Sequence, residues 1–156
     1  MPDRAENTDM PLMLWTEELS VGVEALDADH RQLFAMVNGL FDAIEGGTGT
    51  ELLGALFDAL VDYTRDHFAR EEALMAARHY PGLAAHRAEH LQLAERVHEL
   101  RRNFLAGSLE PVRQELLVLF KTWLTSHIRV TDCGYKPYVM EWPAADGGSA
   151  IERSGN

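Results

Sequence analysis

The stretch HFAREEALMAARHYPGLAAHRAEH, residues 67–90, predicts two helices joined by a tight turn. A Pro-Gly pair interrupts it near the middle, and both residue types disfavour a continuing helix. On either side polar residues recur four apart, His67 with Glu71 and His86 with His90. Residues four apart share one face of a helix, so each pair points in a common direction.

The same helical period extends over four segments of the chain. Apolar residues and histidines recur in steps of three and four, which is typical of helices that bury one face in a bundle. The breaks between segments are short: GGTGT at 46–50, the Pro-Gly turn, and Gly107-Ser108. Short connections favour antiparallel neighbours. We therefore expect an all-α fold, an antiparallel up-down-up-down four-helix bundle, and no strand pattern competes with it.

The chain of 156 residues has the size of one domain. Polar composition and prolines predict a flexible N-terminal arm over residues 1–13. The helical domain is expected over 14–143. The remaining residues, 144–156, are rich in glycine and polar side chains and are expected to form a disordered tail.

The composition excludes several classes of partner. A net charge of −11 argues against nucleic acid and against anionic membrane surfaces, because both attract clustered Lys and Arg. No apolar run approaches the ~20 residues that span a bilayer. The N-terminus lacks the basic and apolar blocks of a secretory signal. The lone cysteine, Cys133, suits a reducing compartment, and we expect a cytoplasmic protein.

Five of the seven histidines fall on the apolar stripes, together with Glu71. They are His30, His67, His86, His90 and His127. A single inward histidine is usually a core residue that is hydrogen-bonded to a neighbour. Six buried groups are different, because each unpartnered imidazole costs roughly 1–3 kcal/mol and a carboxylate costs more. A domain of this size has only about 5–15 kcal/mol of stability. A bound cation is therefore the better explanation.

A second carboxylate, Asp132, lies five residues after His127. In a regular α-helix these two side chains would point about 140° apart. If both reach one site, the helix must widen into a π-type turn or end near residue 130, where Val130 and Thr131 are β-branched. Five imidazoles and two carboxylates exceed what one ion takes, but they suit two ions bridged by the carboxylates. This donor set suits iron or manganese.

The combined spacing His30, H67-x3-E71, H86-x3-H90 and H127-x4-D132 resembles the hemerythrin signature in its bacterial form. The flanking sequences are similar to that family as well. They are TEELSVGVEALDADHRQLF (16–34), RHYPGLAAHRAEH (78–90) and WLTSHIRVTDCGYKPY (123–138). The resemblance covers roughly residues 15–140.

The resemblance implies a cofactor of two iron ions (Fe2+/Fe3+) with an oxo or hydroxo bridge. It implies that His86, His90 and His127 bind one iron. His30 and His67 would bind the other, which keeps a vacant position for dioxygen, and Glu71 and Asp132 would bridge both. Four apolar residues match the family's oxygen pocket, although plain core packing would also place them inside. They are Leu33, Phe68, Trp123 and Ile128.

The resemblance also implies reversible dioxygen binding for storage, delivery or sensing, and not an enzyme. Nitric oxide is a further small ligand to consider. An enzyme on the same scaffold, such as a peroxidase, a nitric-oxide-handling protein or a ferroxidase, is the alternative. Five imidazoles against two carboxylates favour reversibility, since anionic oxygen ligands stabilise oxidised iron. A sensor domain read by a separate partner protein is a third hypothesis.

Other polar residues are expected to have ordinary roles. Glu95 and His98 form E-x-x-H, a fragment of the ferritin-like motif, but both fall off the apolar stripe and are expected in solvent. Glu72 points about 100° from Glu71 and is also expected in solvent. Asp27 is expected to cap the first helix. Cys133 is read as an inert thiol, with a redox-sensitive switch as the alternative.

Overall fold

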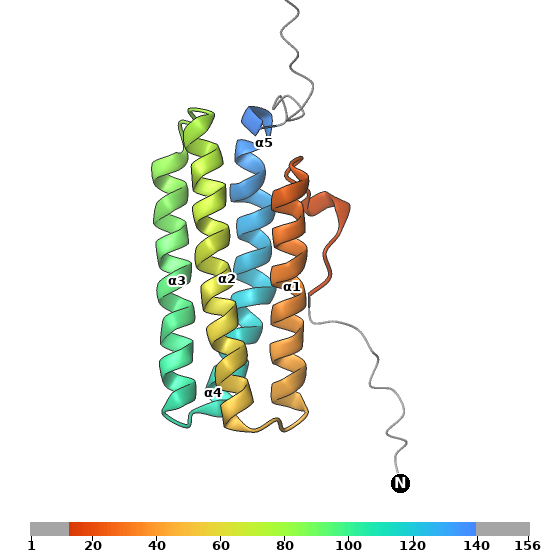
Figure 1. Ribbon diagram of the computed structural model, residues 1–156, viewed down its shortest axis with the longest axis vertical. Helices are drawn as coiled ribbons and strands as arrows, with labels where there is room; N and C mark the ends of the chain where they lie inside the picture. The colour runs from red at the N-terminus through yellow and green to blue at the C-terminus, as the bar shows by residue number, and fades with distance from the viewer. Residues whose placement is uncertain (1–12, 140–156) are drawn as a thin grey trace, which may run out of the picture.

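The computed structural model describes residues 13–139, apart from the side chain of Trp123. The helices form long rods that run alternately down and up (Figure 1), as expected for an up-down-up-down bundle. No strand occurs within residues 13–139. The first three rods are the α-helices α1 (Glu24–Glu45), α2 (Thr50–Ala77) and α3 (Leu83–Leu105). The fourth rod consists of four consecutive elements: α4 (Leu109–Val118), η2 (Leu119–Leu124), η3 (His127–Asp132) and α5 (Cys133–Val139).

The core lies along the common axis of the four rods. One large cluster of buried apolar side chains fills most of the bundle, with Phe57 and Phe104 stacked at 5.2 Å between ring centroids. A smaller cluster, which includes Met75 and Tyr135, closes the end where α2 turns into α3. The buried polar groups of the candidate site lie between the large cluster and the small cluster. The bundle therefore surrounds the site with packed apolar residues.

The fourth rod widens twice from α-helical into π-helical geometry. Residues His127–Asp132 form η3, so of the two alternatives expected from the spacing of these side chains, a π-type turn or a helix end, the structure has the π-type turn. A π-helix bonds residue i to residue i+5, so residues five apart come to lie almost above one another. The turn η2 over Leu119–Leu124 was not expected from the sequence.

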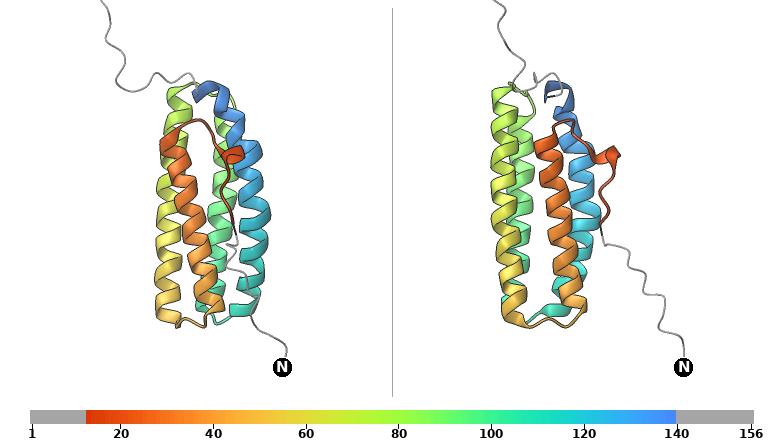
Figure 2. Two further views of the ribbon diagram at one scale, coloured as in Figure 1. Left: turned by 90° about the vertical axis from the view of Figure 1, so that its right-hand side faces the viewer. Right: turned by 45° about the vertical axis from the view of Figure 1, so that its right-hand side comes forward.

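A short segment before α1 packs against the bundle. It contains the 3-10 turn η1 (Glu17–Leu19) and runs between α1 and the fourth rod (Figure 2). Met13, the last residue of the expected arm, is buried, because its backbone N–H and carbonyl bond the side-chain amide of Asn38, each at 2.8 Å. Ordered packing therefore begins at least one residue earlier than the expected boundary. The rest of the arm, residues 1–12, and the tail, 144–156, lie outside the described residues.

Asp27 ties this segment to α1, although not as the expected cap. The helix begins at Glu24, so Asp27 lies inside its first turn. Its carboxylate accepts hydrogen bonds from the Val21 backbone N–H at 2.8 Å and from the Ser20 hydroxyl at 2.5 Å. The Asp27 side chain thus reaches back to the chain that precedes the helix.

Among the helices of residues 13–139, none has the length and apolar character needed to cross a membrane.

Candidate metal centre

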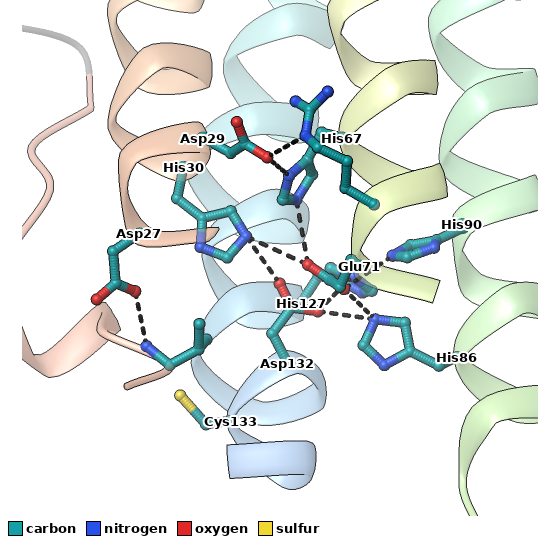
Figure 3. A network of polar contacts seen from close by, with 12 residues as sticks. Asp27, Asp29, His30, His67, Glu71, His86, His90, His127, Asp132 and Cys133 are labelled. Carbon is teal, nitrogen blue, oxygen red and sulfur yellow. Dashed lines mark hydrogen bonds and ion pairs between the residues drawn. The ribbon is translucent and has the colours of Figure 1, made fainter. Parts of the chain in front are cut away.

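Seven buried side chains from all four rods meet on the axis of the bundle, toward the end where α2 turns into α3 (Figure 3). They form two groups whose donor atoms lie within 4.8 Å of one another and which share Glu71. The larger group is Glu71, His86, His90, His127 and Asp132, and the smaller is His30, His67 and Glu71. All seven residues predicted from the sequence are therefore brought together.

The two carboxylates lie between the imidazoles. Glu71 Oε1 is 2.6 Å from His86 Nε2 and 3.3 Å from His90 Nε2, while Oε2 is 3.1 Å from His67 Nε2. Asp132 Oδ1 is 2.8 Å from His86 Nε2, and Oδ2 is 3.2 Å from His30 Nε2. Each carboxylate thus has one oxygen facing each donor group, as a bridge between two ions requires. The π-turn η3 is what lets Asp132 reach the same centre as His127, whose Nε2 lies 2.9 Å from Asp132 Oδ1.

The chemistry of these donors fits a pair of transition-metal ions. Glu71 and Asp132 are at most 1% exposed, yet among the described residues none of their four carboxylate oxygens makes a hydrogen bond of acceptable geometry. The same holds for His90 Nε2 and for both ring nitrogens of His30 and His86. Native proteins rarely leave so many buried polar atoms unpaired. Imidazole nitrogen and carboxylate oxygen together are ligands that iron and manganese accept.

Without a metal, the mixed cluster holds protons on its histidines. Burial alone would lower the pKa of His30, but the carboxylates of Asp132 and Glu71 raise it to about 9. His86 is affected in the same way by the same two carboxylates, and its pKa is also raised to about 9. Burial would raise the pKa of Glu71, but the surrounding imidazoles hold it well below its usual range. A metal must therefore displace protons from these imidazoles, since only the neutral ring is a ligand.

Three further carboxylates hold the outer nitrogens of three candidate ligands. The Nδ1 atom of His67 lies 2.9 Å from Asp29, that of His90 lies 3.2 Å from Glu72, and that of His127 lies 2.8 Å from Glu89. We call Asp29, Glu72 and Glu89 the outer carboxylates. An ionised carboxylate only accepts, so each imidazole donates from Nδ1 and keeps Nε2 for the centre.

The outer carboxylates follow one rule of placement. Each is adjacent in sequence to a candidate ligand, but it serves a histidine on the next rod. Asp29 on α1 reaches α2, Glu72 on α2 reaches α3, and Glu89 on α3 reaches the fourth rod. Adjacent residues of a helix point about 100° apart, so the ligand faces the axis while its neighbour faces the adjoining helix. Two candidate ligands have no such support, because the Nδ1 atoms of His30 and His86 have no hydrogen-bond partner among residues 13–139.

Asp29 is the most enclosed of the three. Besides His67, it accepts from Arg70 Nε and from the Tyr63 hydroxyl, both at 2.8 Å. Burial would raise the pKa of Asp29, but His67, Arg70 and Tyr63 hold it well below its usual range. Burial and the neighbouring carboxylate raise the pKa of Tyr63 to about 12. Asp29 therefore stays ionised behind His67.

Sequence reasoning missed these outer positions. Glu72 was expected in solvent, but its side chain is only 24% exposed, because it turns toward His90 on the adjoining helix. The signal in the sequence is an acid directly beside an inward ligand. On α2, the spacing of Tyr63, His67 and Arg70 also puts three donors on one face.

The comparison with protein families agrees with this geometry. Residues 21–139 match the family model described as the hemerythrin HHE cation binding domain. The chain belongs to the hemerythrin family. It is 38% identical over 130 residues to a bacteriohemerythrin of Stenotrophomonas maltophilia, an alignment that covers 83% of each chain. It is 39% identical over 129 residues to a bacteriohemerythrin of Methylococcus capsulatus, covering 82% of this chain and 97% of the relative. A crystal structure of wild-type hemerythrin superposes with a TM-score of 0.72 at 35% identity, covering 83% of this chain and 98% of the other.

The expected hemerythrin pocket residues lie inside the bundle where the structure describes them. Leu33, Phe68 and Ile128 are buried in the large core cluster. The Phe68 ring stacks on His90 at 3.8 Å between centroids and lies 5.9 Å from His67. The backbone of Trp123 belongs to η2, but its side chain lies outside the described part of the chain.

Three other residues singled out from the sequence, Glu95, His98 and Cys133, do not belong to the two donor groups. Glu95 and His98 are exposed, as expected. Cys133 is partly buried, and burial raises the pKa of its thiol, which keeps it protonated near neutral pH. This protonation agrees with an inert thiol.

Proposed function

We propose that the chain binds dioxygen reversibly at a non-haem di-iron centre and that it does so as a binding protein, not as an enzyme. The observation that carries the proposal is the pair of buried donor groups that share Glu71. Membership of the hemerythrin family supports the same function and favours iron over manganese. When bound, the iron pair supplies the electrons that reversible oxygen binding requires.

Each half of the proposed centre has its own protein ligands. His86, His90 and His127 would hold one iron, and His30 and His67 would hold the other. Glu71 and Asp132 would bind both irons of the oxo- or hydroxo-bridged cofactor that the family implies. Because the His30 side has fewer donors, we assign the open position for the small ligand to that side.

The apolar side chains around the proposed centre are expected to exclude water from it. Leu33, Phe68 and Ile128 are each at most 7% exposed, and we assign them to the walls that keep water from the bound ligand. The hydroxyl of Tyr135 is buried as well, and burial together with Glu71 and Asp132 raises its pKa far above its usual range. Tyr135 therefore keeps its proton. A pocket of this kind protects a ligand that must leave unchanged.

Location and partners form the less specific part of the proposal. We propose a cytoplasmic protein, which its lone cysteine supports. The net charge of −11 disfavours nucleic acid as a partner. We propose dioxygen as the main ligand, with nitric oxide as a competitor for the same position.

The deciding experiment uses protein purified in air. Metal content per chain is measured, and the visible spectrum is followed through reduction, strict anaerobiosis and readmission of air. Two irons and a charge-transfer band that appears with air and fades on deoxygenation support reversible binding. Direct and irreversible conversion to the ferric spectrum, with oxygen consumed, would instead favour the enzyme hypothesis. The same cycle with nitric oxide tests competition.

A further inference from the structure

The two halves of the centre are unequal in their protein support. The larger donor group contains five residues, and the smaller contains three. In the larger group, two histidines are held from outside: His90 by Glu72 and His127 by Glu89. In the smaller group one histidine is held, His67 by Asp29. Each group also contains one histidine, His86 or His30, whose Nδ1 atom has no hydrogen-bond partner among residues 13–139.

An outer hydrogen bond fixes a ligating histidine in two ways. It sets which ring nitrogen carries the proton, and it holds the ring in the orientation that the metal needs. His90 and His127 are therefore preorganised for metal binding, and Asp29 gives His67 the same advantage. His30 and His86 are fixed only by packing and by the carboxylates that a metal would share. The larger group nevertheless has three imidazoles and two outer hydrogen bonds, against two imidazoles and one outer hydrogen bond in the smaller group.

We infer that the two metals are held in a fixed order of strength, with the metal of the His86–His90–His127 half bound first and lost last. This inference rests on the proposed di-iron function. It predicts a one-metal form of the chain in which the metal occupies one known half of the centre. Asp29 is a positioning residue for the weaker metal. Glu72 and Glu89 are positioning residues for the stronger one.

The inference is tested on the metal-loaded protein by slow removal of metal with a chelator. Native mass spectrometry counts the metals on each intact chain as removal proceeds. We expect two phases and an accumulated one-metal species. A crystal structure of that species is expected to show the remaining metal at His86, His90 and His127. Loss of both metals in one phase, or a remaining metal at His30 and His67, would overturn the order.

Isosteric variants assign each outer carboxylate to its phase. Asp29→Asn is expected to speed release of the first metal about tenfold or more and to leave the second phase unchanged. Glu89→Gln is expected to speed the second phase by a similar factor. Asp62→Asn is the matched control, because Asp62 lies on α2 and its ion pair with Arg65 is exposed. A general loss of stability would accelerate both phases together in any variant, and that result would reduce the outer carboxylates to a structural role.

The outcomes separate this inference from the proposed function. Fewer than two metals in freshly loaded wild-type protein would overturn both. Two metals with reversible oxygen binding, but with a single phase of release, would overturn only the order.

Discussion

The imidazole of His67 is held between two carboxylates from different helices. Its Nδ1 lies 2.9 Å from Asp29 on α1, and its Nε2 lies 3.1 Å from Glu71 on its own helix. Asp29 in turn accepts hydrogen bonds from Tyr63 and Arg70. One buried carboxylate of α1 is therefore bonded to three side chains of α2. Packing between α1 and α2 and the orientation of this ligand therefore depend on each other.

Tyr63→Phe removes one support of Asp29 without touching a candidate ligand. We expect the free energy of unfolding to fall by about 1.5–3 kcal/mol, because one hydrogen bond to a charged acceptor is lost. Metal content is expected to stay at the wild-type value, since Arg70 and His67 still hold the carboxylate. Chemical denaturation and metal analysis measure both. Tyr138→Phe is the control, because that side chain is 41% exposed; equal losses in the two variants would contradict a special role for Tyr63.

Glu71→Ala is expected to abolish the paired site. Glu71 is the one residue common to both donor groups, so its loss removes a bridge and a negative charge from each. Metal analysis is expected to give fewer than two ions per chain. Glu95→Ala, at an exposed position, is expected to keep full loading. Two tightly bound metals in Glu71→Ala would contradict the bridging role.

Leu33→Ala tests the proposed pocket wall against simple core packing. Leu33 and Leu40 lie on the same face of α1 and are 3% and 1% exposed, so truncation of either is expected to cost about 2–5 kcal/mol of stability. We expect only Leu33→Ala to speed autoxidation, because only that cavity admits water beside the centre. Spectra recorded after oxygenation give the rates. Equal autoxidation in both variants would assign Leu33 to the core alone.

The metal-free protein is expected to lose stability as the pH rises above neutrality. The pKa of His30 is raised from 6.5 to about 9, so its contribution is fully present below pH 6.5 and is lost as the pH rises through 9. For His30 this contribution is on the order of 3 kcal/mol. The lowered pKa of Glu71 acts in the opposite direction. Its contribution to stability is present above the usual pKa of 4.5 and is lost as the pH falls below that value.

Urea denaturation between pH 4 and 10 measures this profile. The metal-free protein is expected to be most stable between pH about 4.5 and 6.5. The metal-loaded protein is the control, because its ligands are already neutral and the loss between pH 6.5 and 9 should disappear. The same slope in both forms would mean that these histidines are not the ligands.

The sequence predicted the helices and six of the inward donors, the five histidines and Glu71, because both depend on local periodicity. The fourfold spacing of His67 with Glu71 and of His86 with His90 is visible without knowing which helices touch. The π-turn η3 was one of two predicted alternatives, since His127 and Asp132 can share a site only if the helix widens or ends between them.

The outer carboxylates were harder to predict because their roles depend on neighbouring helices. Glu72 has the same local signature as an exposed acid, and only its position opposite His90 on α3 gives it a partner. The packing of Met13 likewise depends on Asn38, which lies 25 residues away on α1. Local sequence carries no measure of such distances.

The wide turn η3 makes the centre depend on how the backbone is wound as well as on which residues are present. A regular helix completes the same arc with fewer residues, so the turn contains surplus chain that an ordinary bundle would not need. If the same residues were wound as a regular α-helix, all seven donors would remain in the protein, but His127 and Asp132 would point about 140° apart and one of them would leave the axis. Anyone who transplants these ligands onto an idealised straight-helix scaffold must therefore copy the irregularity of the backbone together with the side chains.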